Sequence, residues 1–187
     1  MTRRLLVVEP VFGGSHAAWA NGWQAARAHD IPLLTHEASA GRGRMRGAAV
    51  TLAHQAEVWV EKHGRPDLIV ATDMLDLAAF LGLARRTVGD VPAAVYLHEN
   101  QLTYPRQRDE PLDQGLVWAT WRTLVSADAV WCNSAFHRHE LLEALPGLLR
   151  SVPDRDHQGL LPEVRDKTTV LPVGVDLASI ADRPREV

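Results

Sequence analysis

The run Ala93-Ala94-Val95-Tyr96-Leu97, which stops at the polar cluster beginning with His98, decides the fold class. Five consecutive apolar residues bounded by polar residues are typical of a strand that is buried on both faces, as in a parallel sheet. Similar short runs predict further strands at residues 4–9, 32–36, 67–71, 129–133 and 169–171.

Between these runs, apolar residues recur at helical spacing. Ala18, Trp19, Gly22, Trp23 and Ala26 are separated by intervals of three and four and would share one helix face. The predicted helices span residues 15–28, 45–63, 75–86, 114–126 and 135–144. Strands alternating with helices predict an α/β fold with a doubly wound parallel sheet, for which right-handed crossovers favour the strand order 3-2-1-4-5-6.

The remaining segments suggest one domain followed by a linker. Residues 146–167 are rich in Pro, Asp, Arg and Gly with little periodicity, and we expect a long loop there. The segment 172–176 resembles a hinge, and 181–187 has the composition of a linker. We therefore expect one Rossmann-like domain over residues 1–180.

Composition narrows the function classes. The 187 residues are 46% hydrophobic and 23% charged, which places the chain among ordinary globular proteins. A net charge of −3 argues against a general nucleic-acid binder, although local basic patches remain compatible with it. Cys132 follows Val130 and Trp131, a context typical of a buried strand residue and not of a catalytic thiol. Without a signal-peptide or membrane-length apolar stretch, we expect a cytoplasmic location and no membrane partner.

The polar cluster at residues 98–105 is the first candidate site, because ligands of parallel sheets bind beyond the carboxyl ends of the strands. A core could not cheaply satisfy so many donors and acceptors, so binding is favoured over a purely structural histidine. The set suits a sugar or ribose, and the next strand end would line the same edge. The candidate residues are His98, Glu99, Asn100, Gln101, Thr103, Tyr104, Asn133 and Ser134. We expect no metal site, since His98 and Glu99 are adjacent and lack a partner at ligand spacing.

Three other motifs have both a functional and a structural interpretation. Gly13, Gly14, Ser15 and His16 join the first strand to the first helix and suit an anion or sugar, but a tight turn capped by Ser15 explains them equally. A loop with arginines at 42, 44 and 46 suits phosphates, yet short charge runs are usually solvated. Asp73 would cap a helix or bind hydroxyls. These residues are Arg42, Arg44, Arg46 and Asp73.

These motifs together resemble a known family. Residues 127–134 (ADAVWCNS) and 170–176 (VLPVGVD) resemble the amino-terminal half of retaining GT-B glycosyltransferases. More specifically, residues 10–16 (PVFGGSH), 44–49 (RMRGAA), 71–75 (ATDML) and 98–105 (HENQLTYP) resemble the tRNA-queuosine α-mannosyltransferase family. The resemblance implies transfer of mannose from GDP-mannose to queuosine in tRNA, with retention and without a bound cofactor.

The resemblance also implies roles for the candidate residues. Gly13 and Gly14, with Ser15 and His16 beside them, would face the sugar diphosphate, and His98 would be the catalytic residue that contacts the transferred sugar. Asp73, Asn133, Ser134 and the 98–104 residues would contact sugar or acceptor, and the three arginines would contact tRNA phosphates. The donor would be held mainly by a carboxyl-terminal domain of the same protein, so the amino-terminal domain alone should be inactive. Two alternatives are a transferase with another nucleotide sugar and a small or lipid acceptor, and a non-catalytic sugar- or nucleotide-binding module.

Overall fold

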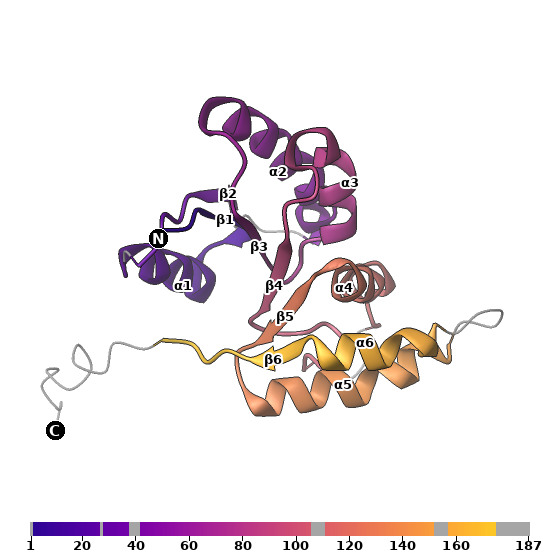
Figure 1. Cartoon of the computed structure of the whole chain (residues 1–187). Helices are drawn as coiled ribbons and strands as arrows, with labels where there is room; N and C mark the ends of the chain where they lie inside the picture. Colours follow the sequence, from indigo (N-terminus) through magenta and orange to yellow (C-terminus); the bar gives the residue numbers. More distant parts are fainter. Residues whose placement is uncertain (1, 27, 38–41, 106–110, 152–156, 175–187) are drawn as a thin grey trace, which may run out of the picture.

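The structure, a computed structural model, describes residues 2–26, 28–37, 42–105, 111–151 and 157–174, without the side chains of residues 42–46. One six-stranded parallel sheet lies at its centre (Figure 1). The strands are β1 (Leu5–Phe12), β2 (Leu33–Glu37), β3 (Leu68–Thr72), β4 (Ala93–Leu97), β5 (Ala129–Cys132) and β6 (Thr168–Val170). The helices are α1 (Gly14–Ala25), α2 (Arg42–His63), α3 (Leu77–Val88), α4 (Gln114–Ser126), α5 (Ala135–Leu149), η1 (Gln158–Leu160) and α6 (Leu161–Asp166). The α/β class and the parallel sheet expected from the sequence are confirmed.

The expected strand order is wrong. The order is β2-β1-β3-β4-β5-β6, with β1 between β2 and β3, instead of 3-2-1-4-5-6. Val7 of β1 pairs with Leu33 on one side, and Leu6 lies in register with Ile69 on the other. The crossover rule fixes the handedness of each connection but not the number of strands that it passes, so periodicity alone could not place β3. The order therefore reverses between β1 and β3, where α/β proteins bind ligands.

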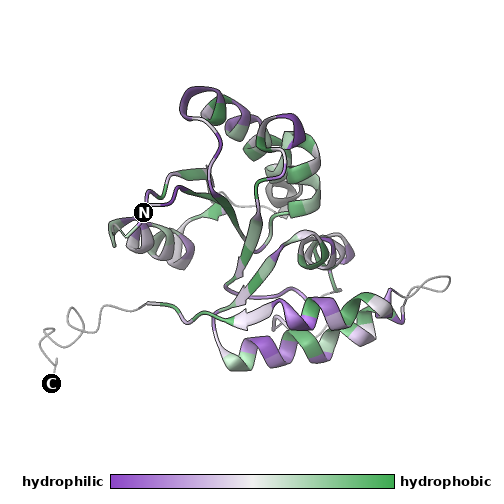
Figure 2. Ribbon diagram, in the orientation of Figure 1, coloured by the Kyte–Doolittle hydropathy of each residue, from purple (hydrophilic) through white to green (hydrophobic). Residues whose placement is uncertain are grey.

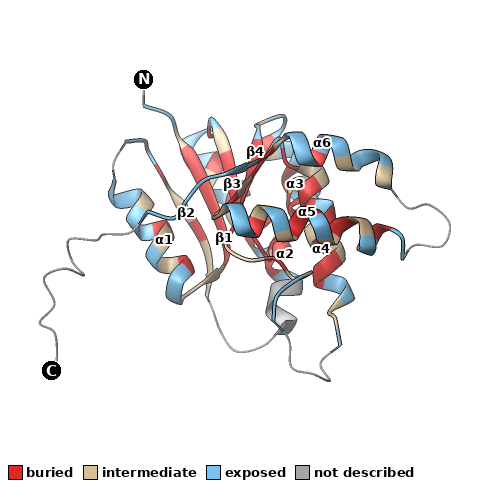
Figure 3. Cartoon of the chain, turned by 90° about the horizontal axis from the view of Figure 1, so that it is seen from below, coloured by how far each residue is buried: buried red, intermediate tan, exposed pale blue. Residues whose placement is uncertain are grey.

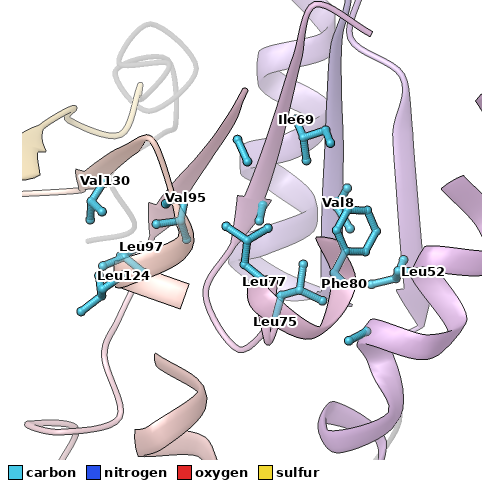
Figure 4. Packing of buried hydrophobic residues seen from close by; sticks show 14 of the residues in the cluster. Val8, Leu52, Ile69, Leu75, Leu77, Phe80, Val95, Leu97, Leu124 and Val130 are labelled. Carbon is cyan, nitrogen blue, oxygen red and sulfur yellow. The ribbon is translucent and has the colours of Figure 1, made fainter. Parts of the chain in front are cut away.

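Alternate residues of β1 point to opposite faces of the sheet. Leu6 and Val8 join the main core beneath α2, α3, α4 and α5, whereas Leu5 and Val7 join a smaller cluster beneath α1. Figure 4 shows Val8 grouped with Leu52 of α2 and Phe80 of α3. The two clusters explain why the central strands are almost entirely buried while the outer helix faces are exposed and polar (Figures 2 and 3).

Two segments expected to be loops are helical in the structure. Helix α2 begins at Arg42, so the arginine segment is not the flexible loop that we expected; arginine and methionine are good helix formers and extend the helix over Gly43. Helix α5 continues through Pro146 to Leu149, and η1 and α6 occupy much of the remaining expected loop. The buried side chains of Leu141, Leu145 and Leu149 offset the hydrogen bond that Pro146 cannot form.

Candidate functional site

The candidate site lies at the carboxyl ends of β1, β3 and β4, beside the reversal in strand order. His16 from the first turn of α1 meets His98 from the end of β4, with ring centroids 4.2 Å apart. The two histidines are 82 positions apart in the sequence, and the sheet brings them together. The structure thus joins the Gly13–His16 segment and the polar cluster into one site.

Glu9 is a site residue that sequence analysis missed. It lies within β1 and is fully buried, and its Oε1 accepts a hydrogen bond from Val11 N at 2.8 Å. Nδ1 of His16 lies 3.2 Å from both Oε1 and Oε2 of Glu9. The signal for this residue was present, since a carboxylate that ends the apolar run 5–8 must find a partner if it is buried.

Asp73 orders the loop that carries His98. Its Oδ1 accepts a hydrogen bond from His98 N at 3.1 Å, and its Oδ2 accepts one from Glu99 N at 3.3 Å. The helix-cap interpretation of Asp73 is therefore wrong: Asp76 caps α3 and accepts a hydrogen bond from Ala79 N at 3.1 Å. The turn that joins β3 to α3 is tight, with Met74 at a φ of 69°. Asp73 lies within this turn and is buried, with 6% exposure.

Aromatic rings surround the His98 side chain on the α1 face of the sheet. Trp19 stacks on Tyr96 at 4.6 Å and meets His98 edge-on at 4.9 Å. Nε2 of His98 is buried and has no hydrogen-bond partner among the described residues. Among the described residues, the buried Nε2 of His137 and Oγ1 of Thr72 share this feature, but only His98 lies beside His16 at the end of β4.

Many polar groups of the 98–105 cluster form hydrogen bonds with one another. Oδ1 of Asn100 accepts hydrogen bonds from Leu102 N and Thr103 N, at 3.1 and 3.0 Å, and Gln101 Nε2 donates to Glu99 Oε1 at 3.0 Å. Thr103 and Tyr104 are exposed. Asn100 therefore shapes the loop, whereas the buried Nε2 of His98 has no hydrogen-bond partner among the described residues.

The neighbouring strand end is tied to the same loop. Asn133 Nδ2 donates a hydrogen bond to the carbonyl oxygen of His98 at 2.6 Å. Ser134 Oγ caps α5 by accepting a hydrogen bond from His137 N at 3.1 Å. Asn133 and Ser134 thus lie where the sequence placed them, and Asn133 holds the His98 loop in position.

The cap at the start of helix α1, after β1, differs from the expected one. Gly13 is the N-cap residue of α1 and no side chain caps the helix, so Ser15, which is exposed, is not the cap. Gly14 has a φ of 52°, a conformation that favours glycine, and a Cβ added there would meet nothing within 4 Å. The segment leaves the first amides of α1 unpaired by any side-chain cap, as an anion-binding turn requires. The side chains of Arg42, Arg44 and Arg46 lie outside the described residues.

The ionisable groups of the site shift one another's pKa values. Burial raises the pKa of Asp73 to about 7, and burial also raises the pKa of Glu99. Burial opposes the charge of His16, but the hydrogen bond and charge of Glu9 outweigh it, so the pKa of His16 is raised. Burial and the charge of His16 lower the pKa of His98 to about 3, which keeps this imidazole neutral. The site therefore sets a histidine whose pKa is raised next to a neutral histidine, with the carboxylates of Glu9, Asp73 and Glu99 beside them.

Two other expectations concern the remainder of the chain. Cys132 is buried, and burial raises the pKa of its thiol to about 11, in keeping with its interpretation as a strand residue. Within the described part of the chain, no helix combines the length and the apolar character needed to cross a bilayer.

Comparison with known proteins places the chain in a family. The family described as tRNA-queuosine alpha-mannosyltransferase N-terminal matches residues 4–175. A tRNA-queuosine alpha-mannosyltransferase of Drosophila melanogaster is 27% identical over 168 residues, which cover 89% of this chain and 43% of the relative. The chain thus spans less than half the length of this curated relative. The match includes all of β1–β6 and the candidate site, and the chain belongs to the tRNA-queuosine alpha-mannosyltransferase N-terminal family.

Proposed function

We propose that this chain is the acceptor-side half of a retaining GT-B mannosyltransferase that transfers mannose from GDP-mannose to queuosine in cytoplasmic tRNA. The observation that carries the proposal is the convergence of the loops after β1, β3, β4 and β5. His16 meets His98, Asp73 binds the backbone of the His98 loop, and Asn133 binds its carbonyl oxygen. A rigid set of polar groups at a switch point suits a sugar held between two domains.

The neutral His98 would contact a hydroxyl of the transferred sugar. Burial holds its pKa near 3, so Nε2 can accept or donate a hydrogen bond without the cost of burying a charge. His98 would position the sugar and would not act as a base, because an imidazole with so low a pKa is a weak proton acceptor.

The Gly13–Gly14 turn and His16 would face the diphosphate of the donor. The raised pKa of His16 favours its protonated form, which next to the uncapped amino terminus of α1 would stabilise the negative charge that builds on the leaving diphosphate. Most contacts to GDP-mannose would come from a carboxyl-terminal donor domain of the same protein, so the 187-residue chain alone should transfer little or no sugar. Arg42, Arg44 and Arg46 are proposed from the sequence as contacts to tRNA phosphates.

A transfer assay tests this function. The complete protein that carries this chain would be incubated with a nucleotide sugar and tRNA, and the digested nucleosides would be analysed by mass spectrometry. We expect a queuosine that gains one hexose with GDP-mannose and no product with tRNA that lacks queuosine. Transfer from another nucleotide sugar, or to a small or lipid acceptor, would replace this proposal with a related transferase. Binding of sugar nucleotides without any transfer would indicate a binding module.

Site variants connect the assay to the structure. His98→Ala should reduce transfer by roughly 100-fold or more, as loss of a transition-state contact does in other enzymes. His139→Ala, an exposed histidine on α5, is the matched control and should retain activity. Equal activity of the two variants would show that His98 does not contribute to transfer.

A further inference from the structure

Two exposed aromatic side chains lie beside the candidate site. The chain contains three phenylalanines, six tryptophans and two tyrosines, all of them within the described residues. Only Phe136, at 75% exposure, and Tyr104, at 48%, are exposed, while every other ring is buried or half-buried. Tyr104 belongs to the loop after β4, and Phe136 lies in the first turn of α5, directly after β5. The exposed aromatic side chains are thus confined to the carboxyl edge of the sheet.

Hydrogen bonds around Asn133 join the two segments that carry these rings. Its Nδ2 donates to the carbonyl oxygen of His98 at 2.6 Å, and its Oδ1 lies 3.2 Å from Nδ1 of His137. His137 is buried, and Phe136 before it projects in another direction, because successive helical residues are rotated by about 100°. The N–H of Tyr104 donates to a carbonyl oxygen of its own loop at 3.2 Å. The backbone under both rings is therefore held by the same network as the site.

Exposed rings of this kind suit the unpaired bases of a nucleic acid. Every base has a flat π-face, and proteins recognise single-stranded RNA by stacking its bases on aromatic side chains. Within the described part of the chain, neither ring packs on another aromatic ring. An enzyme that modifies a base also takes it out of the stack, so the bases next to it need new stacking partners.

The charge beside the rings favours bases over phosphates. Glu99 lies in the loop that carries Tyr104, and Glu140 follows Phe136 by four positions, on the same face of α5. Among the described residues, neither carboxylate forms an ion pair. Each would repel a phosphate, whereas the neutral face of a base meets no such repulsion.

We propose that Phe136 and Tyr104 stack on unpaired RNA bases that flank the modified nucleoside. This inference rests on the proposed function for the identity of the RNA. It adds Phe136, which is not among the residues selected from the sequence, and it gives the ring of Tyr104 a defined ligand. Both residues bind the acceptor without touching the transferred sugar, so their loss raises KM for tRNA and leaves kcat nearly unchanged.

Binding of a fluorescently labelled, queuosine-containing tRNA to the complete protein tests the proposal by fluorescence anisotropy. Phe136→Ala and Tyr104→Ala should each raise Kd by roughly 5- to 100-fold, as loss of one stacked base does. The salt dependence of Kd should keep its slope, because stacking releases no counterions. Leu83→Ala on α3, where the side chain is 48% exposed, is the matched control and should bind as the parent does.

Two further variants of Phe136 separate stacking from apolar burial. Phe136→Trp keeps a ring and should retain the parent affinity, whereas Phe136→Leu keeps an apolar side chain and should bind as weakly as Phe136→Ala. Circular dichroism verifies that each variant is folded. Parent-like binding by both alanine variants would overturn the proposal. Full affinity of Phe136→Leu, with a lower melting temperature of Phe136→Ala, would also overturn it and assign the ring to a contact with another protein segment.

The transfer assay separates this proposal from the proposed function. Mannose transfer by the parent together with parent-like tRNA affinity of the alanine variants would overturn the stacking proposal alone. Loss of tRNA affinity in these variants, with no mannose transfer by the parent, would support stacking and contradict the proposed transferase.

Discussion

At the scale of single residues, the sequence identified the polar cluster but not the separate role of each of its residues. His98, Glu99 and Asn133 stood out because they follow apolar strands. The roles of Asp73 and Asn100 in holding the loop could not be predicted, since they depend on backbone amides that come close only in the folded chain. The position of Glu9 after an apolar run hinted at a buried carboxylate, but its partner, His16, lies in another element and became clear only in the folded chain.

The two histidines should titrate in opposite directions. Burial and the charge of His16 lower the pKa of His98 to about 3, whereas the contacts with Glu9 raise the pKa of His16 above 6.5. In NMR spectra of the chain, we therefore expect the ring resonances of His98 to keep constant chemical shifts from pH 8 to pH 5. Those of His16 should shift with a midpoint above pH 6.5. A titration of His98 near pH 6.5 would show that its ring is not buried as described.

The lowered pKa of His98 makes the stability of the fold depend on pH. Below pH 6.5 the unfolded chain protonates His98 while the folded chain does not, so the contribution of this residue to stability is lost as the pH falls from about 6.5 towards 3. His98→Gln should remove this part of the pH dependence, as measured by urea unfolding at several pH values. An unchanged dependence in the variant would assign it to other groups.

Cys132 should be unreactive in the folded chain. Burial raises the pKa of its thiol to about 11, so almost no thiolate is present at pH 8. We expect no labelling by iodoacetamide in native buffer and complete labelling in denaturant, measured by mass spectrometry. Rapid labelling of the native chain would contradict the burial of β5.

At the scale of elements, the sequence predicted most of the helices and strands but the exact ends of only some of them. The strand at 93–97 agrees with β4 because its apolar run is sharply bounded, and the helix at 114–126 agrees with α4. The helical course of α2 from Arg42 and of α5 through Pro146 was missed, because glycine and proline usually end helices. The helix propensity of the residues beside Gly43 and the buried leucines of α5 override these signals.

Asp76 fixes the start of α3 in two ways. Its Oδ1 accepts a hydrogen bond from Ala79 N, and its Oδ2 accepts one from Arg122 Nη2 of α4 at 2.6 Å. Asp76→Ala should lower the free energy of unfolding by about 1–2 kcal/mol. Arg122→Ala removes only the half-exposed ion pair and should cost less than about 1 kcal/mol. Urea unfolding measures both, and an equal loss in the two variants would show that the cap contributes nothing.

At the scale of the whole molecule, the parallel sheet and its helical layers followed from the alternation of segments, while the strand order did not. The reversal between β1 and β3 brings the Gly13–His16 turn, Asp73 and His98 together, and this juxtaposition defines the site. No pattern within one segment contains that information, because it depends on how far α2 carries the chain across the sheet. The resemblance of separate motifs to one family was the only sequence signal that joined them.

The proposed function requires this domain to recognise the queuosine acceptor at the carboxyl edge of its sheet. The most direct measurement compares the affinity of the 187-residue chain for a queuosine-containing tRNA and for the same tRNA without queuosine, over a range of salt concentrations. We expect both affinities to fall as salt rises, because phosphate contacts are screened, and the queuosine tRNA to bind roughly tenfold more tightly throughout. Equal affinity for the two tRNAs at every salt concentration would contradict the claim.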